Sequence, residues 1–331
     1  MFILVIILSI GFAVVNGAHD AANAIATVVG TRVLSPMKAV AMAAVMNLIG
    51  AATGLAVATT IGKGIVSPDF ITIDVIVAAL VAAIVWEYIT LRVGLPVSGH
   101  HSLIAGLIGA GLAQAGSNAI EWSVLTTKVL PWVVISPVIG FAAGYIVMVA
   151  LLWICRRMSP LKVEGHFSKL QILSAGFMAY AHGKNDGQMP IGLMAVAWML
   201  YKTGSAGGTG TELQVPFWII AVSATAIAFG TALGGWRIIR TLGVRMTALK
   251  PVQGFAAETA AASVIETASV FGIPVSTTHV ITSSIMGVGS TRRLSAVRWG
   301  IAGNIILGWI VTFPICILIG WLIAKLIIAV S

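Results

Sequence analysis

The chain has 331 residues, of which 59% are hydrophobic and only 9% are charged. Soluble domains are about 45–50% apolar and about 25% charged, so this composition excludes water-soluble globules, coiled coils, disordered tails and nucleic-acid-binding proteins. The net charge is +9, and the only two cysteines, Cys155 and Cys316, lie in apolar runs, which excludes a disulfide framework. Apolar runs of about 20 residues without strand-like alternation predict an all-α integral membrane protein.

Ten apolar segments follow one another along the chain. We interpret the first as a membrane span and not as a signal peptide, because no basic region precedes it. Asn, Gly, His and Asp interrupt this first segment at 16–23, and a similar polar run interrupts the sixth at 181–188, so both spans are predicted to be broken helices. The predicted segments are 2–27, 39–60, 72–93, 102–115, 131–154, 168–200, 216–236, 252–271, 279–289 and 299–328.

Two pairs of segments are joined by short connections that contain both glycine and proline. The connections cover residues 94–101 and 272–278, and both residue types break helices. The segment after each connection is too short for a comfortable span. We therefore expect two re-entrant helical hairpins, at about 72–115 and about 252–290.

The two halves of the chain are related by an internal duplication. A shift of 178 residues aligns the hairpin connections with seven identities over the 18 positions from 94 to 111, including Pro-Val-Ser and a histidine. A second alignment pairs Gly17 with Gly183 and Asp20 with Asp186. The predicted organisation is a first repeat at 1–155, a basic cytoplasmic linker at 156–169 and a second repeat at 170–331.

The positions of the basic residues predict the orientation of the chain. If each hairpin enters and leaves on one side, each half crosses three times, and 13 Lys and Arg residues gather on one face against four on the other. The positive-inside rule places the basic face in the cytoplasm and both termini outside. An odd number of crossings makes the second half inverted. Inverted repeats with broken helices are typical of secondary transporters. We therefore expect a secondary transporter in the plasma (inner) membrane of the cell.

The matched aspartates Asp20 and Asp186 are the first candidates for a functional site. A carboxylate inside a bilayer is costly and is commonly functional or paired. Together with Asn23 and Asn185, and with carbonyl groups of unwound backbone, they suit a hard cation such as Na⁺, or a proton carried on aspartate. The alternative is that each aspartate only caps a restarting half-helix.

The hairpin tips are candidates for binding an oxyanion. Ser98 and Ser276 each precede a short helix, whose free N–H groups attract anions, and Thr277 and Thr278 add further hydroxyl donors. Ordinary helix capping is the alternative at any one of these positions. Since Gly99 and His100 stand where the second hairpin has two threonines, we expect the second hairpin to donate more hydroxyl bonds than the first.

Other polar residues are candidates for supporting roles around this site. The candidates are His19, His101, His279, Lys184, Glu258 and Glu266. We expect His101 and His279 to be structural residues, with substrate contact or proton handling as the alternatives. Glu258 and Glu266 are proton or cation sites, or partners of Arg92 and Lys184. The chain contains no phosphate-binding Gly-Lys-Ser/Thr loop, zinc-protease motif or other catalytic signature. The sequence therefore indicates neither an enzyme nor an ATP-driven pump, and we expect no cofactor.

These motifs resemble those of the inorganic phosphate transporter (PiT) family, in its bacterial low-affinity form. The first is Gly-Ala-His-Asp-Ala-Ala-Asn-Ala at 17–24, the second His-Gly-Lys-Asn-Asp-Gly-Gln at 182–188, and the others are the two Pro-Val-Ser hairpins. The resemblance covers essentially the whole chain. It implies phosphate bound at the hairpin tips by Ser98, Ser276, Thr277 and Thr278, coupling cations at Asp20, Asn23, Asn185 and Asp186, alternating access and a homodimer.

The sequence departs from the family pattern at two positions. His19 stands where many relatives have Asn, and Met189 stands where the first half has Asn23. The resemblance therefore favours H⁺ as the coupling ion, with a metal–phosphate complex as a possible substrate form. Na⁺, held by Asp20, Asn23 and Asp186, is the alternative. Symport of sulfate or a related oxyanion is the alternative function.

Overall fold

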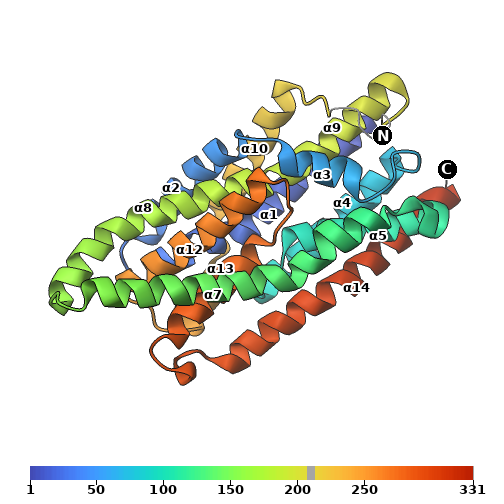
Figure 1. The fold of residues 1–331 in the computed structure, drawn as a ribbon. Coiled ribbons are helices and arrows are strands. Elements are labelled where there is room, and N and C mark those ends of the chain that lie inside the picture. Colours follow the sequence, from blue (N-terminus) through green and yellow to red (C-terminus); the bar gives the residue numbers. More distant parts are fainter. Residues whose placement is uncertain (207–212, 331) are drawn as a thin grey trace.

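The computed structural model describes residues 1–206 and 213–330. The described chain is helical throughout, as predicted, and its only β pairing is one isolated bridge between Val66 and Ile120. Figure 1 shows an elongated helical bundle with both termini at one end and the turn between α7 and α8 at the other.

Each half contains the same series of elements. A long or paired helix comes first, then two helices bent against each other, then a hairpin of two helices and finally a long helix. In the first half these are α1 (Phe2–Gly30), α2 (Pro36–Ala51) with α3 (Ala56–Gly64), α4 (Ile73–Val93) with α5 (Gly99–Ala115), and α7 (Leu130–Cys155), which the short α6 (Trp122–Val124) precedes.

The second half repeats this series with one more helix at its start. Its elements are α8 (Pro160–Asp186) with α9 (Gln188–Thr203), α10 (Phe217–Leu233) with α11 (Trp236–Arg240), α12 (Pro251–Val270) with α13 (Thr277–Ser290), and α14 (Trp299–Val330). In the described part of the chain, four helices are long and apolar enough to cross a membrane, or up to six if each bent pair is one span. That the two halves are inverted stays a prediction.

The predicted hairpins form as two helices around a Gly-Pro turn. Gly94 and Gly272 adopt left-handed backbone conformations, with φ of 83° and 65°, that end the first helix of each hairpin. Ser98 and Ser276 then begin the second helix, each accepting a hydrogen bond from the backbone N–H three residues later. At 17 and 14 residues, α5 and α13 are about 26 and 21 Å long, shorter than the roughly 30 Å hydrocarbon core.

Helices of the two halves pack on each other closely. α1 packs on α10 and α2 on α8, while α5 packs on α14 and α7 on α13. Glycine permits the first two contacts, because a Cβ on Gly17 or on Gly183 would lie 2.3 Å from a backbone oxygen of the facing helix. The apolar core has two main clusters, and α1 joins them by contributing Phe12 to one and Ile25 to the other.

The predicted break at 16–23 is wrong, because α1 runs without interruption from Phe2 to Gly30. Gly17 permits close packing and does not end the helix, and the polar side chains of this stretch find partners on other helices. The predicted break at 181–188 is reduced to Gly187, whose φ of −62° and ψ of −20° stay helical. Unwound carbonyl groups are therefore not offered to a cation by α1.

The predicted linker at 156–169 is mostly helical. Only residues 156–159 separate α7 from α8, since Pro160 occupies the first helical position, where its missing N–H costs nothing. The remainder of the expected linker forms the first turns of α8.

Candidate functional site

Asp20 of α1 and Asp186 at the end of α8 converge inside the protein, and both are only 1% exposed. His182 lies between them, with its Nε2 atom 3.3 Å from Oδ2 of Asp186 and 3.9 Å from Oδ2 of Asp20. One ligand atom from each of the three residues falls within 4.8 Å of the others. This geometry can hold a small cation or a shared proton.

A chain of hydrogen bonds orients the His182 ring. Thr231 of α10 donates its hydroxyl to the Ile227 carbonyl and accepts a hydrogen bond from Nδ2 of Asn47. The amide oxygen of Asn47 therefore faces Nδ1 of His182, at 2.8 Å. Since that oxygen can only accept, Nδ1 carries a proton, and the other ring nitrogen, Nε2, is directed at the two carboxylates.

The second hairpin contacts the carboxylates directly. Thr277 donates to Oδ2 of Asp186 at 3.3 Å, and Thr278 donates to the carboxylate of Asp20 at 3.3 Å. Asn23, one turn after Asp20, donates to both threonine hydroxyls. The N-terminus of α13 thus lies against the aspartates, and its hydroxyls are close enough to serve an oxyanion in the same space.

The first hairpin contributes differently. Ser98 caps α5, and the structure gives no bond from its hydroxyl to either aspartate. His100, two residues later, places its Nδ1 atom 3.7 Å from Oδ1 of Asp186. The two tips are therefore unequal, as the replacement of two threonines by Gly99 and His100 predicts.

Of the residues next to the two aspartates, His19 contacts its aspartate, whereas Asn185 mainly contacts the second hairpin. Nδ1 of His19 lies 2.7 Å from Oδ1 of Asp20. Asn185 donates to the Val275 carbonyl at 2.8 Å and accepts from Ser269 at 3.3 Å, so it ties α8 to the second hairpin. Asn185 thus contacts the hairpin tip more closely than it contacts Asp186.

The histidines His101 and His279 lie in a separate aromatic cluster. Their rings pack edge to face with centroids 4.7 Å apart. His279 stacks on Trp309 at 3.9 Å, and His101 contacts Phe313 at 5.1 Å. The structure thus brings neither histidine to the aspartates.

The two glutamates of α12 also lie apart from the aspartates. Glu258 is fully buried and accepts hydrogen bonds from Thr27, Gln171 and Ser174. Glu266 forms an ion pair with Lys184. Among the described side chains, this is the only ion pair between a carboxylate and a lysine or arginine, so no such cation balances the charges of Asp20 and Asp186.

Two residues of the cluster, His182 and His100, were not predicted as site residues from the sequence. The internal duplication contained a signal for both, because His182 aligns with Asn16 of the first motif and His100 aligns with Thr278 of the second hairpin. Pairing every polar position between the halves, and not only the identical ones, would have identified them.

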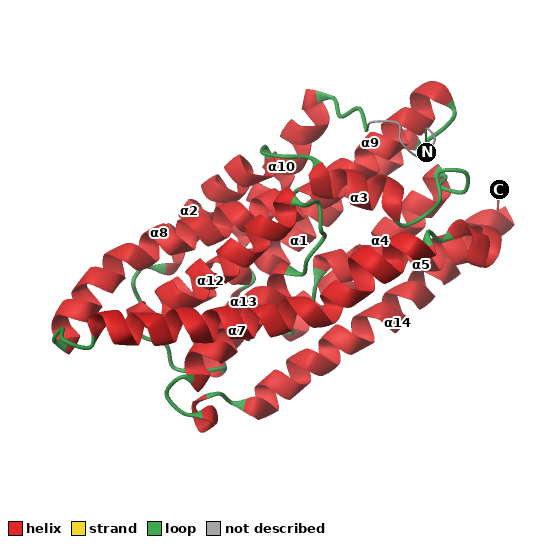
Figure 2. Cartoon of the chain, in the orientation of Figure 1, coloured by secondary structure: helices red, strands yellow, loops and turns green. Residues whose placement is uncertain are grey.

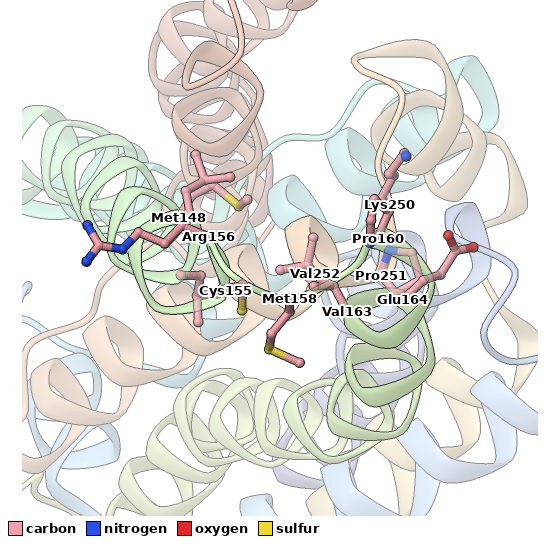
Figure 3. A pocket seen from close by; sticks show the side chains of 12 residues that line it. Met148, Cys155, Arg156, Met158, Pro160, Val163, Glu164, Lys250, Pro251 and Val252 are labelled. Atoms are coloured by element: carbon pink, nitrogen blue, oxygen red, sulfur yellow. The ribbon is translucent and has the colours of Figure 1, made fainter.

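A separate cavity of about 230 Å³ lies beside the turn between α7 and α8. Figure 3 shows Met158 and Val252 between the Arg156 side chain and the Glu164 carboxylate, which lie on opposite sides of the view. None of the predicted site residues lines this cavity, and its lining is mainly apolar. It is not the candidate site.

Buried, paired carboxylates beside polar hairpin tips, in a bundle whose helices are long and apolar enough to cross a membrane, are typical of membrane transport proteins and not of enzymes. The chain matches the phosphate transporter family over residues 16–320, and it belongs to that family. It is 47% identical over 309 residues to a probable low-affinity inorganic phosphate transporter of Rhizobium meliloti, covering 93% of this chain and 91% of the relative.

Two further comparisons agree. A Bacillus subtilis protein with the same name is 38% identical over 320 residues, covering 96% of this chain and 94% of its own length. A solved structure described as the sodium-dependent phosphate transporter superposes with a TM-score of 0.91 at 26% identity, covering 100% of this chain and 99% of the other. The resemblance seen in the sequence motifs is confirmed.

Proposed function

We propose that this protein imports inorganic phosphate by symport with H⁺, through alternating access to the buried site around Asp20 and Asp186. Membership of the phosphate transporter family supports the substrate. The hydroxyls of Thr277 and Thr278, next to the two carboxylates, support a site where an oxyanion and a coupling cation meet. Because two carboxylates and an oxyanion repel one another, positive charge has to enter together with the phosphate.

The orientation of His182 is the observation that carries the choice of H⁺. With Nδ1 donating to Asn47, a neutral His182 directs the lone pair of Nε2 at two carboxylates, and this arrangement is repulsive. A proton on Nε2, or on the facing carboxylate, turns the repulsion into a charge-assisted hydrogen bond. The cluster therefore gains a proton at the place where the site needs positive charge.

Na⁺ is the second candidate for the coupling ion. The likeness to the sodium-dependent phosphate transporter favours it, as do the side-chain oxygens of Asp20, Asn23 and Asp186. However, hard cations prefer oxygen ligands, and beside the hydroxyl oxygens of Thr277 and Thr278 the Nε2 nitrogen of His182 also faces the two carboxylates. This donor set favours H⁺ over Na⁺.

Phosphate is favoured over sulfate by the same cluster. Phosphate carries one or two protons at neutral pH, and these can be donated to the carboxylates, whereas sulfate carries none. The metal ion of a neutral metal–phosphate complex would also reduce the repulsion from Asp20 and Asp186, so we include this complex as a second form of the substrate.

Uptake of radiolabelled phosphate into proteoliposomes tests this function. We expect an imposed inward H⁺ gradient to drive accumulation, an equal Na⁺ gradient to add little, and excess sulfate to compete weakly. Adding Mg²⁺ separates free phosphate from the metal complex. Failure of both gradients would refute symport, accumulation driven by Na⁺ alone would reverse the choice of ion, and full competition by sulfate would reverse the choice of substrate.

The homodimer implied by the family resemblance is part of the same proposal. Light scattering of the detergent-solubilised protein, corrected for bound detergent, tests it directly. We expect twice the mass of one chain, and the mass of a single chain would contradict the proposal.

A further inference from the structure

A cavity of about 290 Å³ lies where α11 and the π-helical segment Thr241–Arg245 that follows it meet the first hairpin. One wall is the end of α4 with Gly94. The other wall carries Arg237, Arg240, Thr241 and Arg245. At about 30 Å³ for each water, the volume admits a tetrahedral oxyanion with part of its hydration shell.

The cavity is attached to the hairpin that forms one tip of the buried site. Thr241 donates to the Gly94 carbonyl at 3.1 Å, and Arg237 donates to the Arg92 carbonyl. A Cβ on Gly94 would lie 2.9 Å from the Cβ of Arg237, so the turn and α11 are in direct contact. Gly94 is four residues before Ser98.

The bend between α10 and α11 packs on α1 next to Asp20, and α11 then lines the cavity. The two helices meet at 59°, at Gly234 and Gly235. A Cβ on Gly235 would lie 2.5 Å from the Ala18 carbonyl oxygen and 3.2 Å from that of His19, the residue that contacts Asp20. A movement of this bend away from α1 would therefore release the contact with the residue beside Asp20.

The chemistry of the cavity suits a phosphate group. Arg237, Arg240 and Arg245 form no ion pair with any described carboxylate, and no acidic residue lines the cavity. A guanidinium group offers paired N–H donors that match two oxygens of a phosphate. The three arginines are exposed, so their attraction is long-range, weak and sensitive to salt.

The other half has a corresponding contact without the arginines. Thr60 of α3 donates to the Gly272 carbonyl at 2.8 Å, as Thr241 does to Gly94. α3 contains a single basic residue, Lys63, whereas the segment from Trp236 to Arg245 contains three arginines. The cavity lined by three arginines, called the arginine cavity below, therefore belongs to the first hairpin, on the face predicted to be cytoplasmic.

We propose that the arginine cavity is a second, outer site for inorganic phosphate, which holds the substrate at the cytoplasmic mouth after the α10–α11 bend opens. This inference rests on the proposed function, since it takes phosphate as the transported ion. It assigns to Arg237, Arg240 and Arg245 the capture and release of phosphate on the inner side, while the buried site around Asp20 couples transport to the cation.

Binding to the purified protein tests the cavity independently of transport. In phosphatidylcholine nanodiscs, ³¹P saturation-transfer NMR follows inorganic phosphate on a variant with Asp20→Asn and Thr278→Ala, which weakens the buried site. We expect this variant to keep a saturation-transfer signal from bound phosphate, and high salt to abolish that signal. The signal should fall at least several-fold when Arg237→Gln, Arg240→Gln and Arg245→Gln are added. The matched control changes Arg292, Arg293 and Arg298, which line another cavity, to Gln and keeps the signal.

Two results of this binding measurement would overturn the proposal. One is an equal loss in the control, which would indicate general surface charge. The other is that the arginine substitutions leave the phosphate signal unchanged and alter only the retention of phosphatidylglycerol added to the nanodiscs. That result would indicate a site for a lipid headgroup.

Transport kinetics from each side give the second test. In proteoliposomes of defined orientation, the arginine variant should raise the KM for phosphate on the cytoplasmic side several-fold and leave the external KM within twofold. Equal changes on both sides would contradict an inner site. If the wild-type protein carries no phosphate, the proposed function fails, while the binding measurement still decides whether the cavity binds phosphate.

Discussion

At the scale of single residues, the paired aspartates define the first prediction. Asp20→Asn and Asp186→Asn each keep the size of the side chain and one acceptor oxygen, but they replace the other oxygen by an NH₂ donor and remove the charge. We expect coupled phosphate uptake to fall by about 10- to 100-fold or more, as on loss of an ion's supporting ligand, while the protein remains folded and extractable. The exposed Asp69, changed to Asn, is the matched control. Normal uptake by both variants would reduce the aspartates to structural residues.

His182 gives the second prediction, which concerns the coupling ion. His182→Asn places an amide N–H near the position of Nδ1 and so can keep the hydrogen bond to Asn47, but it cannot take up a proton near neutral pH. Accumulation driven by an imposed pH gradient should disappear, and counterflow of phosphate, which needs no net proton movement, should persist at a reduced rate. Uptake measured under both regimes separates these effects. If uptake by the variant still depended on the pH gradient, the coupling proton would have to be assigned to another group.

At the scale of the elements, close helix crossings limit what α1 tolerates. A Cβ on Gly17 would lie 2.3 Å from the Ile227 carbonyl oxygen, whereas a Cβ on Gly11 of the same helix would lie 3.8 Å from its nearest neighbour. We therefore expect Gly17→Ala to destabilise the protein by about 1–3 kcal/mol through overpacking. Gly11→Ala gains up to about 1 kcal/mol from helix propensity. Thermal unfolding in detergent compares the two, and equal melting temperatures would contradict the crossing.

The hairpins were predictable because their signals are local. Gly94, Pro96 and Ser98 each determine the backbone within a few residues, so the sequence reveals the turn without its surroundings. The continuity of α1 through residues 16–23 was not predictable in this way. A glycine next to polar residues is consistent both with an unwound helix and with a close crossing, and only the facing α10 decides between them.

Local sequence signals predicted only part of the candidate site. Asp20 and Asp186 stand out because a charge in an apolar run is costly. His182 stands out only after folding, when Asn47 and Thr231, from two other helices, orient its ring. Likewise, nothing near Glu258 in the sequence indicates that Thr27, Gln171 and Ser174 surround it.

At the scale of the whole molecule, the two halves are interleaved and do not form separate domains. α1 packs on α10 and α8 on α2, and each of the two main core clusters contains residues of both halves. The two aspartates come from helices of different halves, so the site exists only when both halves are folded together. This arrangement fits alternating access by movement of helix groups drawn from both halves.

The orientation of the bundle is the last prediction. Thirteen of the 19 Lys and Arg residues are assigned to one face, which we expect in the cytoplasm, with both termini outside. In a background with Cys155→Ala and Cys316→Ala, single cysteines test this with a membrane-impermeant maleimide. Ser159→Cys, in the turn between α7 and α8, should react only from the cytoplasm, and Asp69→Cys, before α4, only from outside. Reaction of both positions from one side would exclude the three-crossing topology, and exchange of the two sides would reverse the orientation of the bundle.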